Sequence, residues 1–159
     1  MLFRSTILDQ RDNRSRVSDA IAKGATYVHD VITRENLDSQ LSKYLKAGDF
    51  LLDLAWNIDA NTILQWCYDH GVMYLNTSIE EWDPYEGGSN KHPLERTLYY
   101  RHMRMREMRS TWNKTGATAI VEHGANPGLV SHLVKKSLVD IASRALKEGK
   151  AAAGVEAAL

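Results

Sequence analysis

The side chains best suited to chemistry gather in two short stretches, and the first lies between Tyr74 and Tyr85. It reads YLNTSIEEWDPY, with Glu80 two residues before Trp82. A carboxylate beside an indole can receive an alkylammonium ion, because the ring face adds about 0.5–2 kcal/mol of cation–π attraction. The same carboxylate can accept a proton during oxidation of an amine. Composition alone favours a plainer interpretation, a solvated acidic loop with Trp82 packed on a sheet.

The second stretch, residues 121–133, reads VEHGANPGLVSHL and joins a short apolar run to a long segment with helical periodicity. It brings His123 and Asn126 to a turn where both can point into a cleft. Pro127 suits the first position of a helix, and Asn126 suits its N-cap. The N-terminus of that helix would direct a positive dipole at the same place. The alternative is structural: His123 bonds a backbone group and Asn126 only caps the helix.

Five apolar runs alternate with segments of helical periodicity, which is typical of βαβ units. The pattern predicts a Rossmann-like α/β fold, a doubly wound parallel sheet with helices on both faces. We expect helices to begin at Thr33 and Asp59 and to end before Gly24, Gly48 and Gly71. The predicted strands are residues 6–8, 25–28, 50–54, 72–75 and 117–121. Two further helices carry apolar stripes, one with Leu94, Leu98, Met105, Met108 and Trp112, the other with Val130, Leu133, Val134, Leu138, Ile141 and Ala142.

Polar residues follow four of the predicted strands. Asp9 ends the first, Asn57 and Asp59 follow the third, and residues 76–81 and 123–126 follow the last two. Parallel α/β sheets bind ligands at the carboxyl ends of their strands, so these loops are the predicted binding site. An acidic residue that ends the second strand of a dinucleotide-binding fold bonds the ribose 2′-hydroxyl and disfavours a 2′-phosphate. Asp9 suits that role.

The glycine turn of a dinucleotide-binding fold, G-x-G-x-x-G after the first strand, does not occur in this sequence. We therefore expect a fragment whose first strand and glycine turn lie upstream of Met1. Residues 1–145 would form a partial NAD-binding domain, and residues 146–159 a tail or the start of a substrate domain. In the strand order 3-2-1-4-5-6 the missing strand is central. Its absence would separate strands two and three from strands four to six and leave unpaired inner edges, unless strands two and four pair directly and close the gap.

Composition is that of an ordinary soluble globular domain, with 43% hydrophobic and 25% charged residues in 159. No apolar run approaches the ~20 residues of a membrane span, and no signal peptide is recognisable. Cys67 is alone, which excludes an internal disulfide and indicates a reducing, cytoplasmic setting. No zinc-ligand spacing occurs and no Ser-His-Asp arrangement can be argued, so we expect no metal site.

Charge is unevenly distributed along the chain. Acids outnumber bases between Asp30 and Glu86, which could help to attract a cationic substrate. Bases outnumber acids between Lys91 and Lys114, but this stretch is too short and too poor in aromatic platforms to indicate nucleic acid. Each block is interpreted first as a solvated face.

Three segments, LDQRD, GVMYLNTSIEEWDPY and VEHGANPGLVSHLVKKSL, resemble bacterial homospermidine synthases, which belong to the wider saccharopine dehydrogenase-like group. The resemblance runs from about Thr6 to about Arg144. The family usually has Glu-Pro-Trp where this chain has Glu80-Glu81-Trp82. The change keeps the carboxylate and the indole but frees the loop backbone.

The resemblance implies an NAD-dependent, cytoplasmic enzyme of polyamine biosynthesis, a homodimer at full length, whose partners are putrescine and related diamines. Putrescine loses a hydride to NAD and becomes an imine, a second putrescine displaces ammonia, and the returned hydride gives homospermidine. The implied catalytic residues are Glu80 and Asn126. Implied substrate-binding residues are Glu80, Trp82, His123 and Asn126, and implied cofactor-binding residues are Asp9, Leu54, Ala55, Asn76, Thr77, Asn126 and Pro127.

Two other functions stay open. A related reductase that joins an amine to a carbonyl compound, such as carboxynorspermidine synthase, would need a Lys or Arg for the substrate carboxylate. A non-catalytic α/β binding or regulatory module would be consistent with the absent glycine turn.

Overall fold

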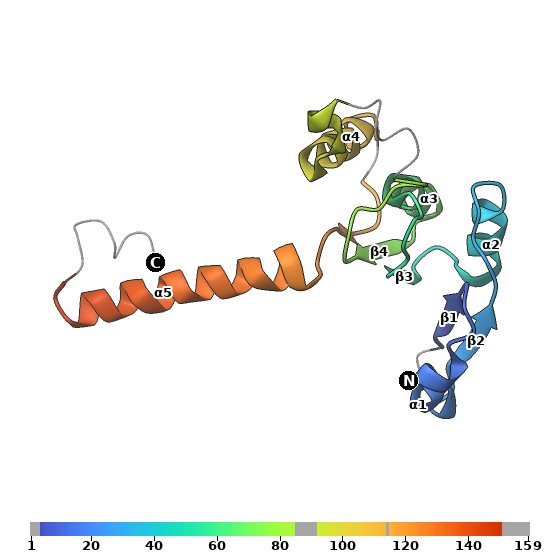
Figure 1. Cartoon of the computed structure of the whole chain (residues 1–159), viewed down its shortest axis with the longest axis horizontal. Helices are drawn as coiled ribbons and strands as arrows, with labels where there is room; N and C mark the ends of the chain where they lie inside the picture. The colour runs from blue at the N-terminus through green and yellow to red at the C-terminus, as the bar shows by residue number, and fades with distance from the viewer. Residues whose placement is uncertain (1–3, 85–91, 114, 151–159) are drawn as a thin grey trace.

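The computed structural model describes residues 4–84, 92–113 and 115–150, and it confirms a parallel α/β fold (Figure 1). Its strands are β1 (Thr6–Asp9), β2 (Thr26–His29), β3 (Phe50–Asp53), β4 (Met73–Asn76) and β5 (Ala119–Ile120). The first four lie within one residue of the predicted bounds. The last is shorter than predicted, because only Ala119 and Ile120 pair with β4.

The strands form two separate sheets. β1 pairs with β2, and the second sheet has the order β3-β4-β5, with every pair parallel. Within the described ranges, β1 and β3 each keep one edge without a strand partner. A doubly wound order would place one strand between these two edges. Of the two expected arrangements, the structure has the open one, with two separate groups of strands.

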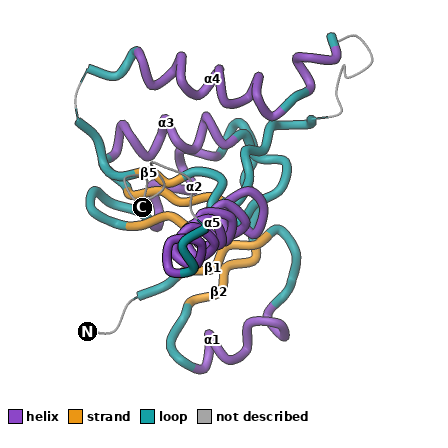
Figure 2. The backbone as a smooth tube through the Cα atoms, turned by 90° about the vertical axis from the view of Figure 1, so that its left-hand side faces the viewer, coloured by secondary structure: helices purple, strands orange, loops and turns teal. Residues whose placement is uncertain are grey.

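Helices connect the strands and cover one face of the larger sheet. Figure 2 shows α3 next to this sheet, with α4 beside α3 on the outer side. The helices are α1 (Ser18–Ala22), α2 (Leu37–Tyr44), α3 (Ala60–His70), α4 (Leu98–Ser110) and α5 (Val130–Lys147). Shorter turns are η1 (Arg14–Val17) and η3 (Pro93–Arg96), both 3-10, and η4 (Ala125–Leu129), which is π-helical. None of the helices in the described ranges is long and apolar enough to cross a membrane.

Local signals explain why α3 begins and ends where the sequence predicts. The Asp59 side chain accepts a hydrogen bond from Thr62 N at 2.7 Å, which satisfies one of the free N–H groups of the first turn. At the other end Gly71 adopts φ 69°, in the left-handed region that favours glycine. Asp59 and Gly71 therefore set the two ends of α3.

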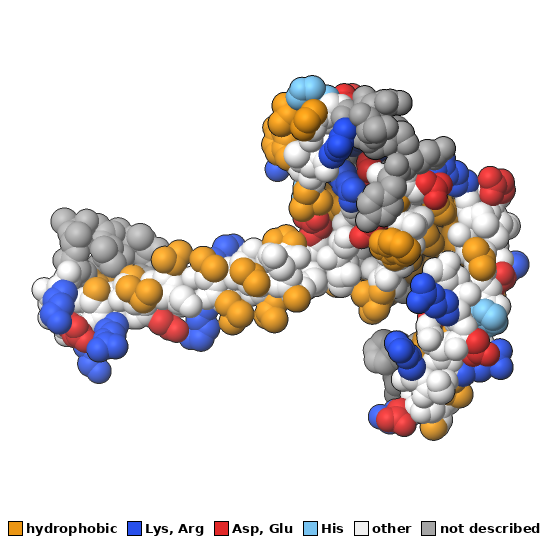
Figure 3. Space-filling view, viewed as in Figure 1, with side chains coloured by type: hydrophobic (Ala, Val, Ile, Leu, Met, Phe, Trp, Pro, Cys, Tyr) orange, Lys and Arg blue, Asp and Glu red, His pale blue; other side chains and the backbone are white. Residues whose placement is uncertain are grey.

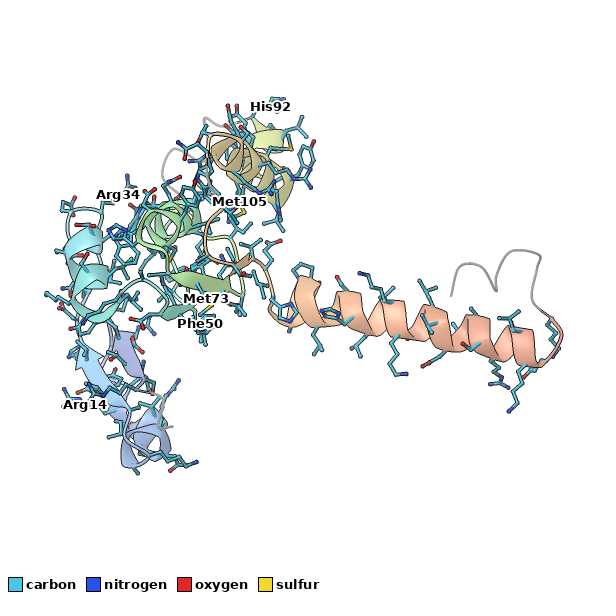
Figure 4. The ribbon with its side chains drawn as sticks, turned by 180° about the vertical axis from the view of Figure 1, so that it is seen from behind. Arg14, Arg34, Phe50, Met73, His92 and Met105 are labelled. Atoms are coloured by element: carbon cyan, nitrogen blue, oxygen red, sulfur yellow. The ribbon has the colours of Figure 1, made fainter. Side chains whose placement is uncertain are left out.

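The core lies between α3, α2 and the sheet. Cys67 is 1% exposed there, and burial raises the pKa of its thiol to about 12. Phe50 and Met73 lie on the other face of the larger sheet, away from α3, and are exposed (Figure 4). The core residues are Leu37, Leu41, Ala60, Ile63, Leu64, Trp66, Cys67, Val72, Tyr74, Ile79 and Met105.

Helix α5 extends away from the rest of the chain as a long arm (Figure 1). Its predicted apolar stripe exists, but residues such as Leu133, Leu138 and Ile141 are more than half exposed, and apolar side chains line the arm in Figure 3. The predicted start of this helix is wrong. It begins at Val130, because a π-helical turn closed by Leu129 N donating to Gly124 O at 2.8 Å comes first.

Two residues assigned to that start have other positions. Asn126 has φ −134° and ψ 119°, outside the helical region, and its side chain caps neither η4 nor α5. The Asn126–Pro127 peptide is cis, and Pro127 lies inside the π-helical turn. The predictions of Asn126 as N-cap and Pro127 as first helical residue are therefore wrong.

The stripe predicted for the preceding helix is half correct. Met105, Met108 and Trp112 belong to the core or pack against it. Leu94 and Leu98 are exposed and do not belong to one continuous helix with the other three. Leu94 lies in η3, which ends before Thr97, and Leu98 begins α4, which Thr97 caps by accepting from Tyr100 N at 3.4 Å.

Candidate functional site

The three loops that follow β3, β4 and β5 meet at the carboxyl-terminal end of the larger sheet. The parallel register pairs Asp53 with Asn76 and Leu75 with Ile120, so the carboxyl ends of β3, β4 and β5 lie together. The loops that follow contain Ala55, the Glu80–Trp82 sequence and the turn from His123 to Gly128. The predicted site residues on this sheet thus lie together at the carboxyl ends of its strands, where parallel sheets bind ligands.

Glu81 fastens the loop after β4 to helix α4. Its carboxylate lies 3.4 Å from Arg101 Nε and 3.2 Å from Arg104 Nη1, and its side chain is 16% exposed. We expected the Glu81 substitution to free the loop backbone, but the two arginines tie it down. The basic stretch predicted as a solvated face therefore neutralises a carboxylate of the acidic stretch.

Glu80 has a different environment from its neighbour. Its Oε1 accepts from Ser78 Oγ at 2.6 Å, and its backbone oxygen accepts from Ala60 N at 3.1 Å. No Lys or Arg in the described parts of the chain forms an ion pair with its carboxylate. Of the two adjacent carboxylates, Glu80 is thus the one without a cationic partner among the described residues.

The indole ring of Trp82 already makes a cation–π contact within the protein. The Arg34 guanidinium lies 5.7 Å from the centre of the indole ring, and it also pairs with Asp83 at 3.2 Å. Trp82 and Arg34 line an open pocket of about 280 Å³, together with Asp59, Thr62, Glu81 and Arg104. An ammonium ion bound to this face of Trp82 would compete with Arg34.

The turn after β5 needs its glycines for close approach. A Cβ on Gly124 would lie 2.8 Å from the backbone oxygen of Thr77, and one on Gly128 would lie 2.8 Å from the His123 backbone. The turn therefore packs directly against the loop after β4. His123, Asn126 and Pro127 are exposed on it, and the His123 ring meets the His132 ring edge-on at 5.3 Å.

A chain of buried polar groups lies beneath these loops. Tyr74 donates from its hydroxyl to Asp53 Oδ2 at 2.8 Å and accepts from Asn76 Nδ2 at 3.0 Å, and Asn76 Oδ1 accepts from Glu122 N at 2.7 Å. Burial raises the pKa of Asp53 and the pKa of Tyr74. Asn76 is 0% exposed, so its side chain holds the loops together and faces no open space.

Glu122 and His102 form a pair that the sequence analysis missed. His102 Nε2 lies 2.6 Å from Glu122 Oε2 and joins α4 to the turn after β5. The two residues are twenty positions apart, His102 inside α4 and Glu122 two residues after β5, so no single helix or strand period relates them. The sequence contained only one indication of this pair: a helix rich in basic residues, which needs carboxylates as partners.

Asp9 lies on the smaller sheet, at the end of β1 as predicted. It accepts from Asn13 Nδ2 at 2.8 Å and from Arg11 N at 2.9 Å. The hydrogen bond from Asn13, then that from Arg11, holds the pKa of the Asp9 carboxyl below its usual value. The group is charged at neutral pH and suited to accept from a hydroxyl.

The loop between β3 and α3 and the first turn of α3 contain groups that fit a polar ligand. Asn57 Oδ1 and Asn61 Oδ1 are buried without a hydrogen-bond partner, and such acceptors are rare in folded proteins. Leu54 and Ala55 are exposed just before them. The hydroxyl and amide donors of a dinucleotide suit these acceptors. No group of three or more possible metal ligands occurs in the described ranges.

Comparison with known proteins gives a consistent picture. The family described as Saccharopine dehydrogenase NADP binding domain matches residues 2–120. Homospermidine synthase of Mesorhizobium japonicum is 30% identical over 144 residues, which are 88% of this chain, and that of Blastochloris viridis is 28% identical over 141 residues, or 86%. The chain spans 29% of the length of each.

A solved structure is similar over nearly the whole chain. It is the homospermidine synthase of Legionella pneumophila in complex with NAD, with a TM-score of 0.69 and 28% identity. The similarity covers 92% of this chain and 28% of that one.

Proposed function

Because the chain belongs to the saccharopine dehydrogenase NADP-binding domain family, we propose that it is the dinucleotide-binding part of an NAD-dependent homospermidine synthase. The similarity to two homospermidine synthases and to a solved NAD complex supports this proposal. The observation in the structure that carries it is the contrast between Glu80 and Glu81. Glu81 pairs with two arginines, whereas Glu80, in the loop after β4, has no cationic partner among the described residues.

The reaction we propose joins two diamines. The amino-bearing carbon of putrescine is oxidised to an imine, and the bound dinucleotide supplies reversible hydride transfer. A second putrescine adds through its amine to the imine carbon, ammonia leaves, and reduction of the new imine gives homospermidine. Glu80 binds the substrate ammonium and takes up and returns the proton. His123 and Asn126 orient the amine, and Asp9, Leu54, Ala55, Thr77 and Pro127 contact the dinucleotide.

The stoichiometry of the reaction tests the proposal. In the full-length enzyme, meaning this chain extended to the length of its relatives, putrescine and NAD should give one homospermidine and one ammonia per two putrescines. NAD should not be consumed, because each hydride removed is returned. Net consumption of reduced dinucleotide with an amine and a carbonyl compound would instead support the carboxynorspermidine synthase-like function. Dinucleotide binding and turnover both absent would support a non-catalytic module.

Cofactor choice is a second expectation. Asp9 is charged and ends β1, so a 2′-phosphate would meet a carboxylate and NAD should bind more tightly than NADP by about tenfold or more, roughly 1.4 kcal/mol. Asp9→Ala should weaken NAD binding and narrow the preference, because Arg11 stays beside the site. The measurement is the pair of dissociation constants for the full-length enzyme. Asp12→Ala, which removes an exposed aspartate paired with Arg14, is the control. Equal or tighter NADP binding by the unmutated enzyme would contradict the role of Asp9.

A further inference from the structure

Glu122 combines three properties that seldom occur in one residue. It is 8% exposed, it carries an ionisable side chain, and its backbone has φ 56°. Residues with a Cβ are strained in this left-handed region, by roughly 1–2 kcal/mol. A glycine would relieve the strain, so the glutamate side chain must contribute something that glycine cannot.

Its contribution is an attachment in two directions. The Glu122 carboxylate accepts from His102 Nε2 at 2.6 Å, which fixes it to helix α4. Its backbone N–H donates to Asn76 Oδ1 at 2.7 Å, and the next N–H, of His123, donates to Asn76 O at 2.9 Å. The start of the turn is thereby held to β4 and to α4 at once.

The anchor on β4, Asn76, is itself held by other polar groups. Asn76 is fully buried, and its side-chain nitrogen donates to Tyr74, which in turn donates to Asp53 on β3. The turn after β5 is therefore connected to both β4 and β3 through hydrogen bonds of Asn76 and Tyr74. Loss of the Glu122 carboxylate would leave only the backbone bonds to Asn76.

We propose that Glu122 is a positioning residue: its bond to His102 fixes the turn from His123 to Gly128, and hence Asn126, against the edge of the sheet where Glu80 lies. This inference rests on the proposed function for the role of Asn126. Misplacement of a reacting group by about 1 Å can lower a rate about a hundredfold, so the side chain acts on turnover without touching substrate.

The test uses variants of the full-length enzyme. Glu122→Gly removes the carboxylate at a backbone angle that glycine tolerates, and His102→Ala removes the partner. Glu122→Gln keeps an acceptor oxygen for His102. The control is Glu107→Gln, which removes an exposed carboxylate from the same helix α4. The readouts are amide hydrogen exchange of the peptide from His123 to Leu129, and kcat and KM for putrescine.

We expect the two deletion variants to exchange these amides about tenfold faster and to lose about tenfold in kcat, with a smaller change in KM. The double variant should lose no more than either single one, and Glu122→Gln should recover much of both losses. Unchanged exchange in Glu122→Gly would overturn the proposal, because the turn would not depend on this bond. Faster exchange with unchanged kcat would overturn it as well. If the unmutated enzyme turns over no diamine, the proposed function fails, while hydrogen exchange still decides whether Glu122 holds the turn.

Discussion

Glu80→Gln in the full-length enzyme is expected to lower turnover of putrescine by about a hundredfold or more, since a positioned general base contributes roughly 10²–10⁴-fold. The substitution keeps the size of the side chain and its hydrogen bond from Ser78. It removes the charge that no Lys or Arg in the described ranges neutralises, so both the attraction for the ammonium ion and the acceptor for its proton are lost. NAD binding should be nearly unchanged.

Steady-state kinetics with putrescine and calorimetric titration with NAD would separate these effects. Glu35→Gln is a matched control, because it removes one exposed carboxylate from the same acidic region but lies in the turn before α2. Its turnover should equal that of the unmutated enzyme. Turnover of Glu80→Gln within a few-fold of the same value would mean that Glu80 is only a solvated loop residue.

The 159-residue chain by itself is expected to bind NAD too weakly to measure, with a dissociation constant above about 1 mM, or less than roughly 4 kcal/mol of binding free energy. The pyrophosphate of a dinucleotide binds at a glycine turn and the helix N-terminus behind it, and no such turn occurs in this sequence. The edges of β1 and β3 also have no strand partner in the described ranges, and such edges favour association with other chains.

Calorimetric titration of this chain with NAD, a thermal melt and sedimentation would test the expectation. We expect no heat of binding, a broad transition or none, and association that increases with concentration. The control is the full-length enzyme, this chain extended to the length of its relatives, which should bind NAD. Micromolar binding by the 159-residue chain, together with one sharp transition, would contradict this expectation.

The features that the sequence predicts well depend on neighbouring residues. Asp59 and Gly71 bound α3 because each satisfies backbone groups or angles within its own turn. Asp9 ends β1 because the apolar run ends there. The separation of the sheets follows from strand order alone, which is why it could be expected without knowledge of any contact.

The features that the sequence did not predict depend on contacts between distant segments. The turn after β5 takes its path because Gly124 lies against Thr77, a residue forty-seven positions earlier, and periodicity places the helix start at Pro127 instead. Glu81 and Glu122 find their partners only when α4 lies beside the loops. Residue types thus predicted a site at these loops, whereas the different partners of Glu80, Glu81 and Glu122 required the fold.

The buried thiol of Cys67 makes the chain its own probe of core opening. With 1% exposure and a pKa raised to about 12, the side chain is protonated and out of reach of alkylating reagents while α3 is packed. Its modification at neutral pH must therefore pass through an opened state, and the labelling rate reports how often that state forms. Since the sequence has no other cysteine, all labelling comes from Cys67. A cysteine introduced on the exposed helix α5 would react without opening of the core.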